Sequence, residues 1–161
     1  MRLDTTTTIL GALTNLAALQ TWFANFSKKQ RGPQRSLLLE LHFNYRVLLD
    51  LFRDTESSTL DVIDSLQTKN FLRLAESDFD FNTLKRAKVT VMAAGTKPYL
   101  QRFVGLTTEE LLTNLYQKIA ILQHYNDLRT KKPHLVQKIR FSIRLQHVIE
   151  IFTLLLRHIK K

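Results

Sequence analysis

The spacing of the apolar residues restricts the fold of this chain more than any other feature of its sequence. Apolar side chains recur every three or four positions along most of the 161 residues, which is the period of an α-helix with one buried face. We therefore expect an all-α fold. The pattern predicts one helical domain over residues 1–161, built as a bundle of four long helices with short connecting helices.

The first third of the chain predicts two long helices. The first carries the apolar period from Ile9 to Phe26, and Thr8 is placed to cap its N-terminus. Gly32 and Pro33 end this helix and begin the second, which we expect from about Gln34 to Arg53. The apolar stripe of the second helix is wide, which indicates burial on more than one side.

The middle of the chain predicts shorter elements. Residues 57–66 suit a short capped helix, and another helical turn is expected over 71–74. A longer helix is expected to start at Ser77 or Asp78 and to close at Gly95. The β-branched run Val89–Val91 would suit a strand, but the chain offers it no partner strand.

The last third gives the clearest pattern. Thr107 and Glu110 form a capping box, in which each side chain accepts a hydrogen bond from a free backbone N–H at the start of a helix. We expect this helix to run to about Arg129, followed by a turn over Thr130–Pro133 and a long helix over about His134–His158. Because the turn is short, the two helices are predicted to pack as a long antiparallel hairpin.

Composition excludes several kinds of site. The chain has no Cys, which excludes disulfide scaffolds, zinc–cysteine sites, iron–sulfur centres and a cysteine nucleophile, and which fits a reducing cytoplasm. No two of its 4 Gly lie within nine residues of each other, which argues against Gly-rich phosphate loops. We therefore expect a cytoplasmic protein without a cofactor.

No metal site is predicted either. The acidic run 76–80 lacks the Gly of a calcium loop, and its acids suit a helix N-terminus. His124 with Asp127, and His147 with Glu150, could each share a helix face. In the predicted hairpin these two pairs would lie about 10 Å apart, which is too far for one ion.

Positive charge is concentrated in the C-terminal half. The formal charge is +10, made up of +4 over residues 1–53, −5 over 54–80 and +11 over 81–161. A basic face attracts phosphate without regard to base sequence. We expect the hairpin to contact nucleic acid, another polyanion or an acidic protein surface through six cations: Arg129, Lys131, Lys132, Lys138, Arg140 and Arg144.

Other residues support or extend this prediction. Tyr99, Tyr116 and Tyr125 would stack on bases if they were exposed beside the cations, although half-buried packing is the ordinary role of such residues. The acidic segment 54–80 could meet the basic face of another copy, which would favour self-association. The sequence therefore indicates a binding or assembly module with a nucleic-acid or protein partner, rather than a free-standing enzyme.

An enzymatic alternative rests on Arg140 and His147. The stretch Arg140-Phe-Ser-Ile-Arg-Leu-Gln-His147 is similar to the Arg, four to six residues, then His of small helical nucleic-acid enzymes of the HEPN type. The resemblance implies a metal-independent ribonuclease in a helical bundle that dimerises. In such an enzyme His147 would act as general base or acid on a ribose hydroxyl, and Arg140 would stabilise the phosphorane charge.

The N-terminal helix offers a third interpretation. Trp22, Phe23 and Phe26 precede a basic flank, as aromatic residues do at a membrane interface. Polar residues such as Asn15 and Gln20 interrupt the apolar segment, so a buried amphipathic helix is favoured and a membrane partner is not expected. The alternative is a subunit that docks to a membrane or a larger complex through residues 9–26.

Overall fold

Every regular element is helical in the part of the chain that the computed structural model describes, residues 18, 20–53 and 58–160. The all-α prediction is therefore confirmed. Residues 20–29 are helical, whereas Thr8 and most of the predicted start of the first helix fall outside the described residues. The later elements are α2 (Gly32–Arg53), α3 (Thr59–Ser65), α4 (Lys69–Glu76), η1 (Phe81–Thr83), α5 (Val91–Ala94), α6 (Pro98–Gln101), α7 (Thr108–Lys131), η2 (Pro133–Leu135) and α8 (Phe141–Lys160).

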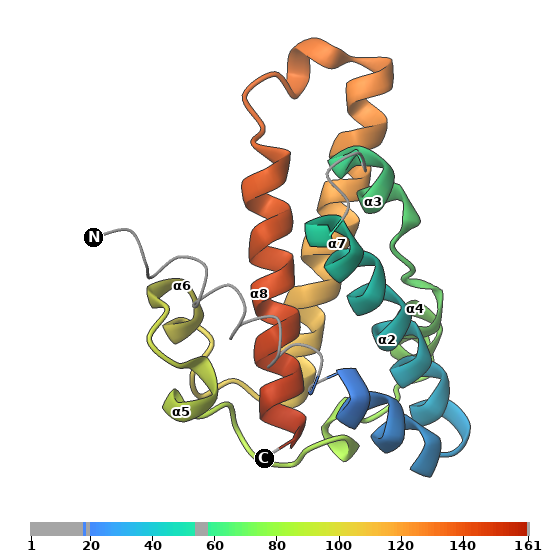
Figure 1. Cartoon of the computed structure of the whole chain (residues 1–161). Helices are drawn as coiled ribbons and strands as arrows, with labels where there is room; N and C mark the ends of the chain where they lie inside the picture. The colour runs from blue at the N-terminus through green and yellow to red at the C-terminus, as the bar shows by residue number, and fades with distance from the viewer. Residues whose placement is uncertain (1–17, 19, 54–57, 161) are drawn as a thin grey trace.

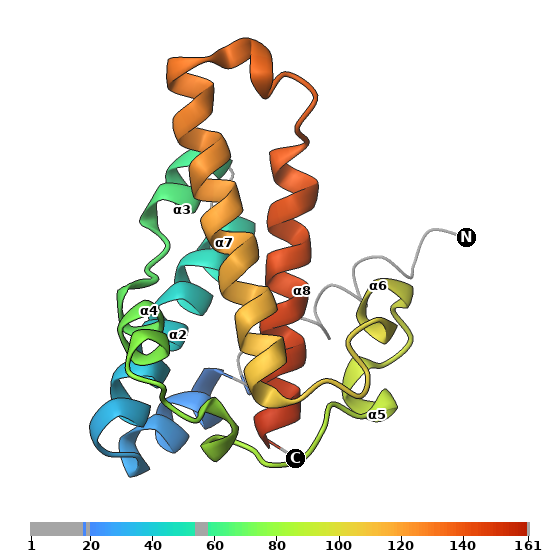
Figure 2. The ribbon, with the colours of Figure 1, turned by 180° about the vertical axis from the view of Figure 1, so that it is seen from behind.

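Helices α7 and α8 lie at the centre of the molecule, side by side and running in opposite directions (Figure 1). Helices α2, α3 and α4 pack on one side of this pair, and the short helices α5 and α6 pack beside α8 on the other (Figure 2). Because α8 has neighbours on both sides, most of its second half is buried, which explains why its apolar residues are not confined to one stripe.

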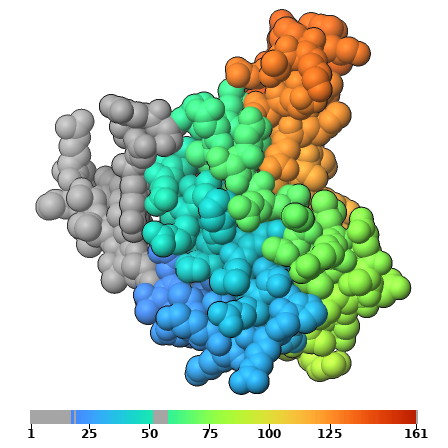
Figure 3. Space-filling model, turned by 90° about the vertical axis from the view of Figure 1, so that its right-hand side faces the viewer, coloured from blue at the N-terminus to red at the C-terminus, as the bar shows by residue number. Residues whose placement is uncertain are grey.

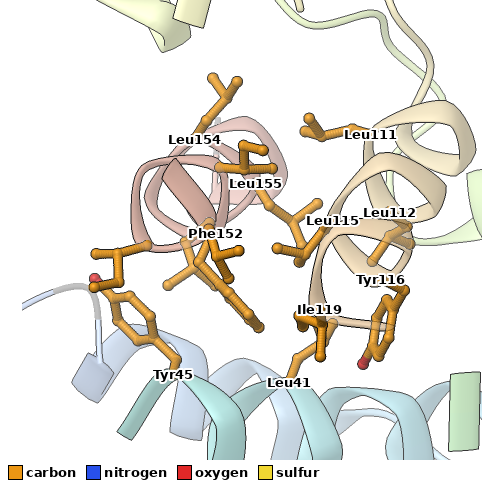
Figure 4. Packing of buried hydrophobic residues seen from close by; sticks show 14 of the residues in the cluster. Leu41, Tyr45, Leu111, Leu112, Leu115, Tyr116, Ile119, Phe152, Leu154 and Leu155 are labelled. Carbon is orange, nitrogen blue, oxygen red and sulfur yellow. The ribbon is translucent and has the colours of Figure 1, made fainter. Parts of the chain in front are cut away.

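The core forms where α2 meets the central pair (Figure 4). Its side chains are spaced three or four apart on each helix, as an amphipathic helix requires. They include Leu41 and Tyr45 from α2, Leu112, Leu115 and Ile119 from α7, and Phe152 and Leu155 from α8. The rings of Tyr45 and Phe152 stack with their centroids 5.8 Å apart. Burying each of these side chains stabilises the fold by about 1.5–3 kcal/mol.

A buried carboxylate joins α2, α4 and α7. The Glu40 carboxylate accepts hydrogen bonds from the backbone N–H groups of Asn70 (2.6 Å) and Phe71 (3.1 Å) in the first turn of α4. It also accepts one from the Tyr116 hydroxyl at 2.9 Å. Burial of the phenol and the Glu40 charge raise the pKa of Tyr116 well above its ordinary value, so this hydroxyl keeps its proton and donates. Glu40 thus caps a helix that is remote in sequence.

Two amide side chains hold the C-terminal end of α3 and its connection to α4. Asn44 exchanges two hydrogen bonds of 2.7 Å with the backbone of Gln67. Gln123 on α7 donates to the carbonyls of Ile63 (3.1 Å), in the last turn of α3, and of Leu66 (2.7 Å), its C-cap. These side chains add hydrogen-bond partners where the helix ends and its own bonding pattern stops.

Two local predictions are confirmed by the backbone geometry. Thr107 and Glu110 form the capping box, with the Glu110 N–H donating to the Thr107 hydroxyl and the Thr107 N–H donating to the Glu110 carboxylate. Gly32, the first residue of α2, has a φ of +60° and directly follows the non-helical residues 30–31 that end the helix over 20–29. Glycine adopts this left-handed conformation without the penalty that a side chain would bring.

The single helix predicted over residues 77–95 is wrong. The structure has η1 at its start, non-helical backbone over 84–90 and α5 at its end. Asp80 and Thr90 cap the two short helices with their own side chains, which competes with a continuous helix. No strand forms in the described residues, but the Val89 backbone exchanges hydrogen bonds with Gly105 (2.9 Å) and Leu106 (2.8 Å) instead of bonding along a helix.

The long helix predicted over 134–158 begins later than expected, at Phe141. Pro133 starts η2, and successive i to i+3 hydrogen bonds then close tight turns up to Ile139. The connection between α7 and α8 therefore spans residues 132–140 rather than four residues. This longer connection shifts the pairing of the two helices, and Arg144 lies opposite Tyr125.

Candidate polyanion interface

The predicted basic residues lie at the end of the molecule that projects furthest from the core. We define the tip as residues 129–144, from the last turn of α7 to the first turn of α8. The tip extends beyond the neighbouring helices (Figure 1), and a side view shows it standing clear of α2 and α3 (Figure 3). All six predicted cations, Arg129, Lys131, Lys132, Lys138, Arg140 and Arg144, are solvent-exposed.

The charge of the tip is largely uncompensated. Lys131 forms an ion pair with Asp127 one turn earlier on α7, with its Nζ 2.8 Å from the carboxylate oxygen. Within the described part of the chain, the other five cations have no carboxylate within 4.0 Å. The tip itself contains no acidic residue. Because like charges held close together repel, the tip favours the approach of an anion.

Few apolar contacts constrain the tip. Of residues 127–144, all of which the structure describes, Val136 is the only buried residue, and Leu135 beside it is 57% exposed. Val136 thus anchors the connection while its neighbours face solvent. A surface of this kind is typical of a binding element that contributes little to the core.

None of the three tyrosines considered for base stacking is exposed. Tyr116 is buried against Glu40 and Phe71, so it cannot reach a ligand. Tyr99 and Tyr125 are half-buried, and each already has a cationic neighbour. The Arg102 guanidinium lies 5.7 Å from the Tyr99 ring centroid, and the Arg144 guanidinium lies 5.5 Å from that of Tyr125.

The two residues of the HEPN-like spacing occupy different environments. Arg140 is exposed and precedes α8, where its carbonyl accepts the first helical hydrogen bond from Arg144. His147 lies seven residues later, about 10 Å along the helix, with its ring stacked on Tyr99 at 4.0 Å. No described hydrogen bond or ring contact joins Arg140 to His147. On α8, Arg144 lies one turn before His147 and is therefore nearer to it along the helix than Arg140 is.

Two of the carboxylates considered above as metal ligands have other partners in the structure. Glu150 forms an ion pair with Lys97 at 2.8 Å, and Asp80 caps η1 through the Asn82 N–H at 3.0 Å. In the described residues no three His, Asp or Glu side chains come together as a metal-binding group. The described helices also include none with the length and apolar character needed to cross a bilayer.

Two further cations, which the sequence pattern did not indicate, lie near Arg144 in the folded protein. Arg102 follows α6, and Lys118 is half-buried on α7. Burial and the nearby charges of Arg102 and Arg144 lower the pKa of Lys118 below its ordinary value. Neither residue belongs to a cluster of cations in the sequence, so only the packing of α6 and α7 against α8 could reveal them.

Comparison with known proteins adds no further assignment. No protein-family model matches the chain, and no curated protein or solved structure shows significant similarity to it.

Proposed function

We propose that this chain is a cytoplasmic binding module, a bundle of four long helices whose α7–α8 hairpin contacts nucleic acid through the tip. One observation carries the proposal: six exposed cations project from the body of the molecule, and one of them is ion-paired in the described part. The phosphate backbone is the regular, dense polyanion that such a surface fits best.

The mode of binding follows from the chemistry of the tip. Lys and Arg side chains displace condensed counterions from phosphates, so affinity falls steeply as salt rises. Such contacts position a strand without reading its bases. The half-buried tyrosines beside the tip already have cationic neighbours, which favours backbone recognition over base stacking. We therefore expect little dependence on base sequence.

A matched pair of variants tests the proposal. In the tip triple, Arg129, Lys132 and Lys138 are replaced by Gln. In the base triple, the same change is made at Lys28, Lys29 and Arg31, which are exposed at the opposite end of the molecule (Figure 1). The two triples remove the same residue types and the same net charge, so they separate a local surface from overall charge.

The measurement is fluorescence anisotropy of labelled single-stranded and duplex DNA and RNA with protein freed of bound nucleic acid. We expect wild type and the base triple to bind alike, and the tip triple to bind about 100-fold more weakly at low salt. Equal losses in both triples would mean that net charge alone drives binding. An absence of binding by wild type at low salt would reject nucleic acid as the partner and point to an acidic protein surface.

A further inference from the structure

Three cations from three different elements lie near one another beside the part of α8 that carries Arg144 and His147. Arg144 belongs to α8, Lys118 to α7, and Arg102 to the turn that follows α6. The charges of Arg102 and Arg144 both reach Lys118 and disfavour its protonated form. We call these three residues the inner cluster. They are separated by up to 42 positions in the sequence, so the fold alone creates the cluster.

Aromatic rings, rather than carboxylates, hold two members of the inner cluster. The Arg102 guanidinium lies 5.7 Å from the ring centroids of both Tyr99 and Phe103, and Arg144 lies 5.5 Å from that of Tyr125. Tyr99 is itself fixed by stacking on His147, with the rings 12° from parallel. A cation–π contact orients a guanidinium without neutralising it, so the full positive charge stays available to a ligand.

The acidic residue on this face does not offset the cluster. Burial and, to a smaller extent, the Glu150 charge raise the pKa of Tyr99, and the Glu150 carboxylate is itself paired with Lys97 at 2.8 Å. In the described residues, no carboxylate lies within 4.0 Å of Arg102, Lys118 or Arg144. Bringing three uncompensated cations together is unfavourable in the free protein, and a bound anion would remove that cost.

We propose that the inner cluster binds successive backbone phosphates of the same nucleic-acid strand that the tip holds. This inference rests on the proposed function, because Arg144 belongs to both surfaces. Lys118 lies seven residues, about 10 Å, along α7 from Tyr125, the residue that faces Arg144. That distance corresponds to about three phosphates of one B-form strand, so a strand that follows α7 away from the tip reaches the cluster.

Single substitutions at Arg102 and Lys118 test the inference. The variants Arg102→Gln and Lys118→Gln each remove one phosphate partner outside the tip. We expect each to weaken binding of a short labelled oligonucleotide about tenfold and to reduce the slope of log K against log salt by about one. The control is Lys69→Gln, an exposed cation on α4 across the molecule (Figure 2), which should bind like wild type. Lys118→Arg keeps the charge and should retain most of the affinity.

A second readout does not depend on affinity. NMR titration of the Lys118 side chain reports its pKa with and without the oligonucleotide. A phosphate bound in the cluster raises the Lys118 pKa, because it supplies the opposite charge that the free protein lacks. Arg102→Gln should also raise the Lys118 pKa in the free protein, because it removes a repelling charge.

The outcomes separate this inference from the proposed function. If the tip triple loses binding while Arg102→Gln and Lys118→Gln bind like wild type and the Lys118 pKa does not respond to the oligonucleotide, the tip binds and the inner cluster does not. That result overturns the inference and leaves the function in place. If wild type shows no salt-dependent binding, both fail together. Weaker binding in both single variants with a raised Lys118 pKa supports both.

Discussion

The two ends of the α7–α8 pair are built from the same helices but differ in almost every physical property. At the end where α7 begins and α8 finishes, α7 buries Leu111, Leu115 and Ile119. Most residues of α8 after Leu145 are buried there too. Between residues 127 and 144 only Val136 is buried, while cations dominate the surface. One end of the pair therefore carries the core of the fold, and the other end is an exposed cationic surface that contributes little to it.

The largest expected effect is on the free energy of unfolding and comes from a substitution in the buried end of the α7–α8 pair. Phe152 is fully buried and stacks on Tyr45, so Phe152→Ala removes a large apolar side chain and leaves a cavity. We expect the free energy of unfolding, measured with urea, to fall by about 3–5 kcal/mol. The matched change at the tip is Leu135→Ala, which should cost less than about 0.5 kcal/mol. Similar losses at the two ends would contradict the division of roles.

A somewhat smaller loss is expected at the buried carboxylate. Glu40→Ala leaves two N–H groups of α4 and the Tyr116 hydroxyl without their acceptor. We expect a loss of about 2–3 kcal/mol in the free energy of unfolding, since unsatisfied buried donors are costly. The exposed Glu76→Ala, at the C-terminal end of α4, serves as the control and should change stability by less than about 0.5 kcal/mol. A Glu40→Ala protein as stable as the control would show that the cap contributes nothing.

Acid should lower the free energy of unfolding, because it protonates the buried His158. The Thr108 hydroxyl donates to the Lys85 carbonyl at 2.6 Å, so it accepts a hydrogen bond from His158 Nε2 at 2.8 Å. Burial and, secondarily, the Lys85 charge lower the pKa of His158 below 6.5. The unfolded chain therefore binds a proton at His158 more readily than the folded protein does. The contribution of neutral His158 to the free energy of unfolding is complete above pH 6.5 and is lost progressively as the pH falls below it.

Unfolding free energies at about pH 7.5 and pH 5.5 check this expectation. Wild type should be less stable at the lower pH, and His158→Gln, whose amide can still donate to Thr108, should lose less on acidification. Burial also lowers the pKa of His42, so some pH dependence will remain in the variant. An exposed-site control, His134→Gln, should behave like wild type. An unchanged acid response in His158→Gln would rule out this role.

The smallest expected effect on stability is at the tip. Replacing Arg129, Lys132 and Lys138 by Gln removes exposed charges that have no ion-pair partner in the described residues. The free energy of unfolding should change by less than about 0.5 kcal/mol. Differential scanning calorimetry of the tip triple and wild type gives this comparison. A large loss of stability would mean that the tip is part of the fold rather than a free surface.

Much of the fold was predictable because the deciding information is local in the sequence. The apolar period predicted the helices, and the capping box predicted the start of α7 to the residue. The break at 84–90 and the extension of the predicted turn at 130–133 to residue 140 were missed because apolar residues continue through both stretches at helical spacing. There the side-chain caps of Asp80 and Thr90, and the turns after Pro133, outweigh the period.

The candidate site divides in the same way. The six cations of the tip are close in sequence, so their clustering could be predicted from the sequence alone. Arg102 and Lys118 were missed because each stands apart from other cations, and their proximity to Arg144 depends on tertiary packing. Likewise, nothing in the sequence links Glu40 to the start of α4, 30 residues later.

The most direct test of the central claim is the salt dependence of nucleic-acid binding. With five unpaired cations, the tip should contribute about −4 to −5 to the slope of log K against log salt for duplex DNA, in wild type and in the base triple alike. The tip triple should reduce it to about −2. Equal slopes in all three proteins, or no binding by any of them at low salt, would contradict the assignment of binding to the tip.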